Sequence, residues 1–92
     1  MDLENYKDDL NKKQMIKNNF HIRTWINHKK NYFHVSTTYT LDAGYETMVF
    51  PSNQSEEIIN FGDIYCKRYS SEEASIKGHA ETISKIYQEV IK

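Results

Sequence analysis

A period-two alternation of apolar and polar residues between positions 20 and 41 constrains the fold most strongly. Successive side chains of a β-strand point to opposite faces, and this stretch is rich in β-branched and aromatic residues, so we expect two strands. The apolar residues occupy even positions in the first strand and odd positions in the second: Phe20, Ile22 and Ile26, then Phe33, Val35, Tyr39 and Leu41. Antiparallel strands bury both sets on one face only if the numbers of paired residues sum to an odd value.

This parity rule limits the connection between the two strands. A two-residue loop satisfies the rule, whereas a three-residue loop would bury the polar face. Lys29–Lys30 and Lys30–Asn31 both fit, and asparagine tolerates the positive φ that the second choice requires at Asn31. The sequence therefore predicts a tight hairpin with lysine at its tip.

The next segment predicts a turn and a central strand. In "LDAGY", Asp42 and Ala43 suit a type I turn, and Gly44 can supply the left-handed residue that follows. The run "YETMVF" is apolar on both sides except at Glu46, which is typical of a strand inside a sheet, and Pro51 ends it.

A fourth strand is predicted at "DIYCKRY". It could extend backwards through Ile58 and Phe61, with Gly62 as a break or bulge.

The C-terminal segment predicts a helix. Ser70 can cap it, and Glu73 three residues later completes a capping box. Helical periodicity then predicts an inward-facing apolar stripe, with Ile86 at its edge: Ile76, Ala80, Ile83, Tyr87 and Val90.

These elements predict one α+β domain over residues 1–92, in which an antiparallel meander of about four strands is packed by the C-terminal helix. We expect a short N-terminal helix or arm in residues 1–18, the sheet in 19–69 and the helix in 70–92. Asp2 would cap the N-terminal helix, and its apolar anchors are Leu3, Tyr6 and Leu10.

Composition disfavours several classes of partner and location. Charge is nearly balanced, with 12 Lys and Arg against 13 Asp and Glu, which disfavours nucleic acid and membranes as partners. Cys66 is the only cysteine, which favours a reducing intracellular compartment. The sequence contains no apolar run long enough to span a bilayer, and its first residues are polar rather than signal-like.

A stripe of small residues on the helix is the first candidate site. On the expected outer face lie Ser71, Ala74, Ser75, Gly78 and Thr82. A glycine in an exposed helix interior costs about 1 kcal/mol relative to alanine. Close approach of another backbone would offset this cost, so the stripe is a candidate interaction surface.

A polar cluster is the second candidate. Glu46 is a lone charge in an apolar strand and would need Arg68, Arg23 or a histidine as its partner if buried. The candidate polar site combines Glu46 and Arg68 with His34 and His79, as a site for a small ligand or a metal.

The sequence contains no recognisable catalytic or cofactor-binding motif. The histidines, at positions 21, 28, 34 and 79, lack the spacing of a zinc motif, so we expect them to be hydrogen-bonded locally. The sequence also lacks a nucleophile elbow, a P-loop and a Rossmann glycine set. We therefore expect a protein that is not an enzyme and that binds neither metal nor cofactor.

An aromatic sheet face beside a basic hairpin tip is the third candidate. Trp25 and Tyr32 could stack on the bases of a single strand, and Lys29 and Lys30 could contact its phosphates.

The runs "HVSTTYT", "YETMVF" and "RYSSEEASIKGH" resemble a group of small phage- and prophage-encoded proteins of uncharacterised function. Members share a V-S-T strand, an E-T-M-V-F strand, and an R-Y-S/T start followed by E-E-A and G-H in the helix. The resemblance covers about half of the chain, from the second strand to the middle of the helix. The matching positions are Val35, Ser36, Thr37, Glu46, Thr47, Met48, Val49, Phe50, Arg68, Tyr69, Ser70, Glu72, Glu73, Ala74, Gly78 and His79.

This resemblance implies a phage or prophage origin and a bacterial cytoplasmic location, and it supplies no catalytic residue. Together with the small-residue stripe, it leads us to expect an accessory protein that binds a host or phage protein or forms a homodimer. The alternatives are a single-stranded nucleic-acid-binding module and a ligand or metal binder around Glu46, His34 and His79.

Overall fold

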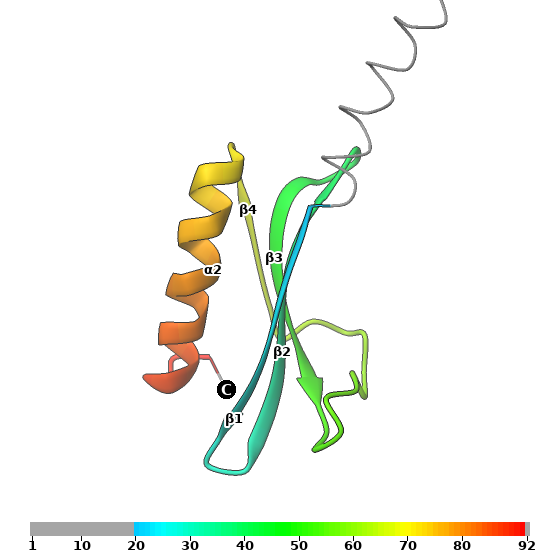
Figure 1. Cartoon of the computed structure of the whole chain (residues 1–92), viewed down its shortest axis with the longest axis vertical. Coiled ribbons are helices and arrows are strands. Elements are labelled where there is room, and N and C mark those ends of the chain that lie inside the picture. Colours follow the sequence, from blue (N-terminus) through cyan, green and yellow to red (C-terminus); the bar gives the residue numbers. More distant parts are fainter. Residues whose placement is uncertain (1–19, 92) are drawn as a thin grey trace, which may run out of the picture.

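A computed structural model describes residues 20–91 of the chain, which form a four-stranded antiparallel sheet and one helix (Figure 1). The strands are β1 (His21–His28), β2 (Asn31–Thr40), β3 (Gly44–Ser52) and β4 (Tyr65–Tyr69), and the helix is α2 (Glu72–Tyr87). The strand order β1-β2-β3-β4 is a meander, and α2 lies across one face. The predicted α+β meander with a C-terminal helix is confirmed. The expected N-terminal helix lies outside the described residues.

The first hairpin follows the parity rule. His28 pairs with Asn31, so the loop is Lys29–Lys30, the first of the two choices, and both lysines have positive φ, at 52° and 66°. Ile26 pairs with Phe33 in the same register. The apolar sets of both strands therefore lie on the face that α2 covers.

The second turn also follows the sequence, whereas the fourth strand is shorter than expected. Gly44 has φ 68° and pairs with Thr40, as a left-handed residue after a type I turn would. The backward extension of β4 is wrong, because only Ile58 forms an isolated bridge, with Ser52. The side-chain oxygen of Asn53 accepts hydrogen bonds from two backbone N–H groups farther along the chain, which curls the β3–β4 connection into turns.

Helix α2 begins one residue later than expected. Its N-cap is Ser71 rather than Ser70, and the Ser71 hydroxyl accepts a hydrogen bond from the backbone N–H of Ala74 at 3.1 Å. Ala74 stands where a capping box needs Glu or Gln, so the predicted box with Glu73 does not form. Glu73 instead lies in the first turn, where the helix dipole favours an acidic residue.

The face of α2 that packs on the sheet is not the expected one. Its buried residues are Ser75, Gly78, His79, Thr82 and Ile86. The predicted inward stripe mostly faces outward: Ile76 is 48% exposed, Tyr87 53% and Val90 67%, Ala80 is exposed, and only Ile83 packs against the core. The prediction of the inward face is therefore wrong.

Close packing and polar side chains explain this orientation. At Gly78, a Cβ atom would overlap the ring of Tyr69, so the absence of a side chain lets β4 and α2 approach. The sheet also places the hydroxyls of Thr37 and Thr47 beneath the helix, where they need hydrogen-bond partners. The apolar core lies nearer the far end of α2 and is small: Ile26, Phe33, Val35, Val49, Ile86 and Ile91.

Candidate functional site

His79 forms a hydrogen-bonded chain between α2 and the sheet. Its Nδ1 atom lies 2.7 Å from the hydroxyl of Thr37, and its Nε2 atom lies 2.9 Å from the hydroxyl of Thr24. The Thr37 hydroxyl in turn lies 2.5 Å from that of Thr47. A neutral imidazole donates from one nitrogen and accepts at the other, so it satisfies both sides of this chain. His79 is 5% exposed, and burial lowers its pKa. These features fit a structural role inside the protein.

The structure does not bring the predicted polar site together. Glu46 and Arg68 face each other across β3 and β4, with Arg68 Nε donating to Glu46 Oε2 at 3.0 Å. Of the partners predicted for Glu46, which were Arg68, Arg23 or a histidine, the structure shows Arg68. His34 shares their face of the sheet, whereas His79 lies beneath α2 on the opposite face. A ligand or metal site that combines these four residues is excluded.

His34 lies in an aromatic environment. It is 4% exposed, its ring centroid lies 4.6 Å from that of Trp25 and 6.3 Å from that of Phe50, and neither ring nitrogen has a hydrogen-bond partner within residues 20–91. Burial and the nearby Arg23 lower its pKa, which keeps the ring neutral. Within the same residues, no group of three or more His, Cys, Asp or Glu side chains could hold a metal ion.

Cys66 is exposed, but its thiol group has low reactivity. Partial desolvation of the thiol group, a hydrogen bond to Glu46 and the negative charge of that carboxylate raise its pKa to about 11. A thiol reacts through its thiolate form, and almost none of that form exists at neutral pH.

The small-residue stripe is occupied by the protein itself. Ser75, Gly78 and Thr82 are buried against the sheet, Ala74 is half-buried and Ser71 caps the helix. The prediction that this stripe is an interaction surface for another chain is therefore wrong. A group does approach Gly78 closely, but it is the side-chain ring of Tyr69 in the same chain rather than another backbone.

The apolar residues predicted to face inward form a stripe along α2 and just beyond its end, which we call the outer stripe: Ile76, Ala80, Ile83, Tyr87 and Val90. Four of them are exposed, and the half-buried Ile83 also packs against the core. Their spacing alternates between four and three residues, which is the spacing of the seam between two packed helices. Sequence periodicity identified these residues, but periodicity alone could not say which of the two faces of α2 meets the sheet.

The hairpin-tip residues divide between the two sides of the sheet. Trp25 and Tyr32 line one small pocket, of about 180 Å³, together with the acidic residue Glu56. The Lys29 ammonium lies 2.6 Å from the Glu89 carboxylate at the end of the helix. The structure thus brings Trp25 and Tyr32 together, but Glu56 lines the same pocket. Of the two lysines, Lys29 is already neutralised by Glu89.

No helix in the described part of the chain is long and apolar enough to cross a bilayer. Comparison with protein families, curated proteins and solved structures finds no match for this chain.

Proposed function

We propose that this chain is a small accessory protein of the phage or prophage type that acts without catalysis, by self-association through the outer stripe of α2. The observation that carries this proposal is the exposure of four of the five apolar residues of this stripe, while another face of α2 is already packed on the sheet. Water-exposed apolar surface of this kind is stabilised by burial against a matching surface.

The outer stripe is complementary to itself in an antiparallel arrangement. A two-fold axis between Ala80 and Ile83 places Ile76 of one copy opposite Tyr87 of the other. The same axis places Ala80 opposite Ile83 of the second copy, so that the one small residue of the stripe meets a larger one. Such an interface is isologous and closes as a dimer.

Charge along the seam favours a second copy. On the flank away from the sheet, Glu73, Lys77 and Glu81 alternate in sign, so an approaching copy meets no block of like charge. A single helix pair is smaller than a standard interface of about 20–30 residues per partner. We therefore expect a weak dimer with a dissociation constant in the micromolar range or above. This corresponds to a free energy of association no more favourable than about −8 kcal/mol.

Sedimentation velocity across a concentration series tests the proposal. We expect a monomer–dimer equilibrium between about 10 µM and about 1 mM protein. Ile76→Lys and, independently, Ala80→Glu place a charge in the seam and shift the chain to monomer. Leu41→Lys is the matched control, because Leu41 is an exposed apolar residue that lies in the β2–β3 turn and not on the outer stripe. The proposal would be contradicted if the wild-type chain stayed monomeric throughout the range. It would also be contradicted if both seam variants dimerised as strongly as the wild-type chain.

Single-stranded nucleic acid remains the second candidate, on the ground that Trp25 and Tyr32 line one pocket. A titration of Trp25 fluorescence with an oligonucleotide at low salt tests it. Quenching that saturates and weakens with added salt would favour this function.

A further inference from the structure

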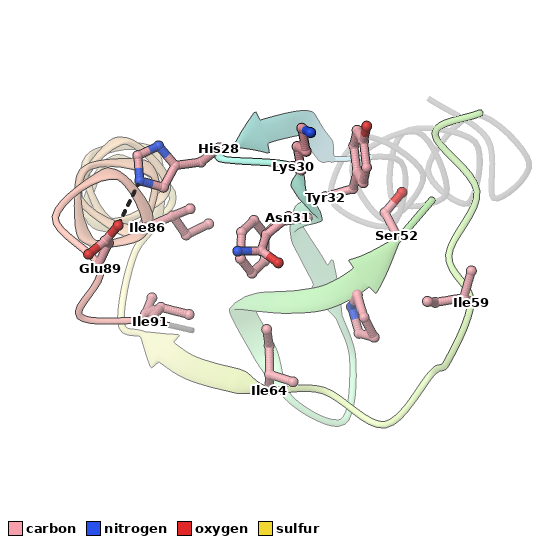
Figure 2. A pocket seen from close by; sticks show the side chains of 12 residues that line it. His28, Lys30, Asn31, Tyr32, Ser52, Ile59, Ile64, Ile86, Glu89 and Ile91 are labelled. Carbon is pink, nitrogen blue, oxygen red and sulfur yellow. Dashed lines mark hydrogen bonds and ion pairs between the residues drawn. The ribbon is translucent and has the colours of Figure 1, made fainter. Parts of the chain in front are cut away.

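An open pocket lies where the β1–β2 hairpin, the end of α2 and the β3–β4 connection meet (Figure 2). Its volume is about 610 Å³, within the range of roughly 300–1,000 Å³ that is common for small-molecule sites. Much of its lining is apolar: Phe33, Pro51, Ile59, Ile64, Ile86 and Ile91. Figure 2 shows Ile86 and Ile91 on the side of the helix, with Ile59 on the opposite side. An apolar ligand segment of moderate size could therefore be buried there.

The charged groups at the rim favour an anion. Glu89 is the only acid that lines the pocket among residues 20–91, and its carboxylate already meets Lys29 Nζ at 2.6 Å and His28 Nε2 at 3.4 Å. Lys30 also lines the pocket, and its ammonium has no ion-pair partner within the described residues. An incoming anion would thus find an available cation at the rim of the pocket, where the Glu89 carboxylate is already neutralised.

We propose that this pocket binds an amphipathic monocarboxylate, with the apolar tail against the isoleucines and the carboxylate at Lys30. Apolar burial supplies most of the binding free energy, and the lysine selects the charged head group. This site is separate from the outer stripe, because the pocket uses Ile86 and Ile91 whereas the stripe uses residues on the other side of α2.

Methyl and amide NMR titration with decanoate, below its micellar concentration, tests the proposal. We expect saturable shifts at Ile59, Ile64 and Ile91, with weaker binding of the neutral analogue 1-decanol and of acetate. Lys30→Gln should weaken decanoate binding by about two- to fivefold and leave 1-decanol binding unchanged, as expected for loss of an exposed ion pair. Ile64→Ser should weaken the binding of both long ligands.

Lys77→Gln is the matched control, because it removes an exposed lysine on α2 that does not line the pocket. It should bind decanoate as wild type does. The proposal fails if decanoate does not saturate, if 1-decanol binds as tightly as decanoate, or if the shifts map to the outer stripe.

Discussion

Gly78 is the point at which α2 and β4 come closest, since the ring of Tyr69 occupies the space that a Cβ atom would need. In an exposed helix, Gly78→Ala would raise stability by about 1 kcal/mol through helix propensity. Here the added methyl group forces the Tyr69 ring to move, and overpacking typically costs about 1–3 kcal/mol. We therefore expect Gly78→Ala to lower the free energy of unfolding, measured by urea denaturation.

A double-mutant cycle separates the two effects. In a Tyr69→Ala background the overlapping ring is absent, so Gly78→Ala should raise stability by about 0.5–1 kcal/mol. The same change in both backgrounds would contradict the close approach of Tyr69.

His79 links stability to pH. Burial holds its pKa below the ordinary value of 6.5, so the unfolded chain binds the proton more readily than the folded protein does. The contribution of neutral His79 to the free energy of unfolding is therefore fully present above pH 6.5. It is lost as the pH falls from 6.5 towards the lowered pKa of the folded protein. The pKa values of His21 and His34 are lowered in the same direction and add to this loss.

The variant His79→Gln tests this contribution. Glutamine retains hydrogen-bonding atoms but does not titrate, so the loss of stability between about pH 7.5 and about pH 5 should be smaller than in wild type. Urea denaturation at a series of pH values measures the slope. An unchanged slope would show that His79 does not supply this pH dependence.

At the scale of the element, the start of α2 depends on a single hydroxyl. Ser71 satisfies the backbone N–H of Ala74, whereas Ser70 lies outside the helix. Ser71→Ala should therefore lower the free energy of unfolding by about 1 kcal/mol. Ser70→Ala is the adjacent control and should leave stability nearly unchanged. Thermal unfolding followed by circular dichroism compares the two, and a larger loss from Ser70→Ala would place the cap one residue earlier.

The two faces of α2 show how an element can be identified correctly and oriented wrongly. The spacing of Ile76, Ile83 and Tyr87 predicted a helix with one apolar face, and the helix is present. The other face, however, carries His79, the partner for the buried threonines, and Gly78, which permits close contact. Burying the apolar face instead would remove His79 as the partner of the Thr37 hydroxyl, and Thr37 and Thr47 would keep only their mutual hydrogen bond. A buried polar group that loses a hydrogen bond costs about 1–3 kcal/mol.

At the scale of the whole molecule, the small core makes stability sensitive to single truncations. Val49 is fully buried in the central strand β3 and pairs with Val35. Val49→Ala should cost about 1–3 kcal/mol, a large part of the roughly 5–15 kcal/mol that stabilises a typical domain. Val90→Ala removes the same atoms from an exposed site and should change stability little at low protein concentration. Equal losses in the two variants would contradict the core described above.

The sequence by itself determined the local geometry of this protein. Side-chain alternation assigned β1 and β2, parity limited their connection to two residues, and Gly44 marked the next turn, because each of these depends on neighbouring residues alone. Only the tertiary structure decided which face of α2 is buried, that His34 and His79 lie on opposite sides of the sheet, and that Tyr69 covers Gly78. These outcomes depend on which groups meet across the sheet–helix interface, where hydrogen bonding and close packing outweighed the apolar periodicity of the helix.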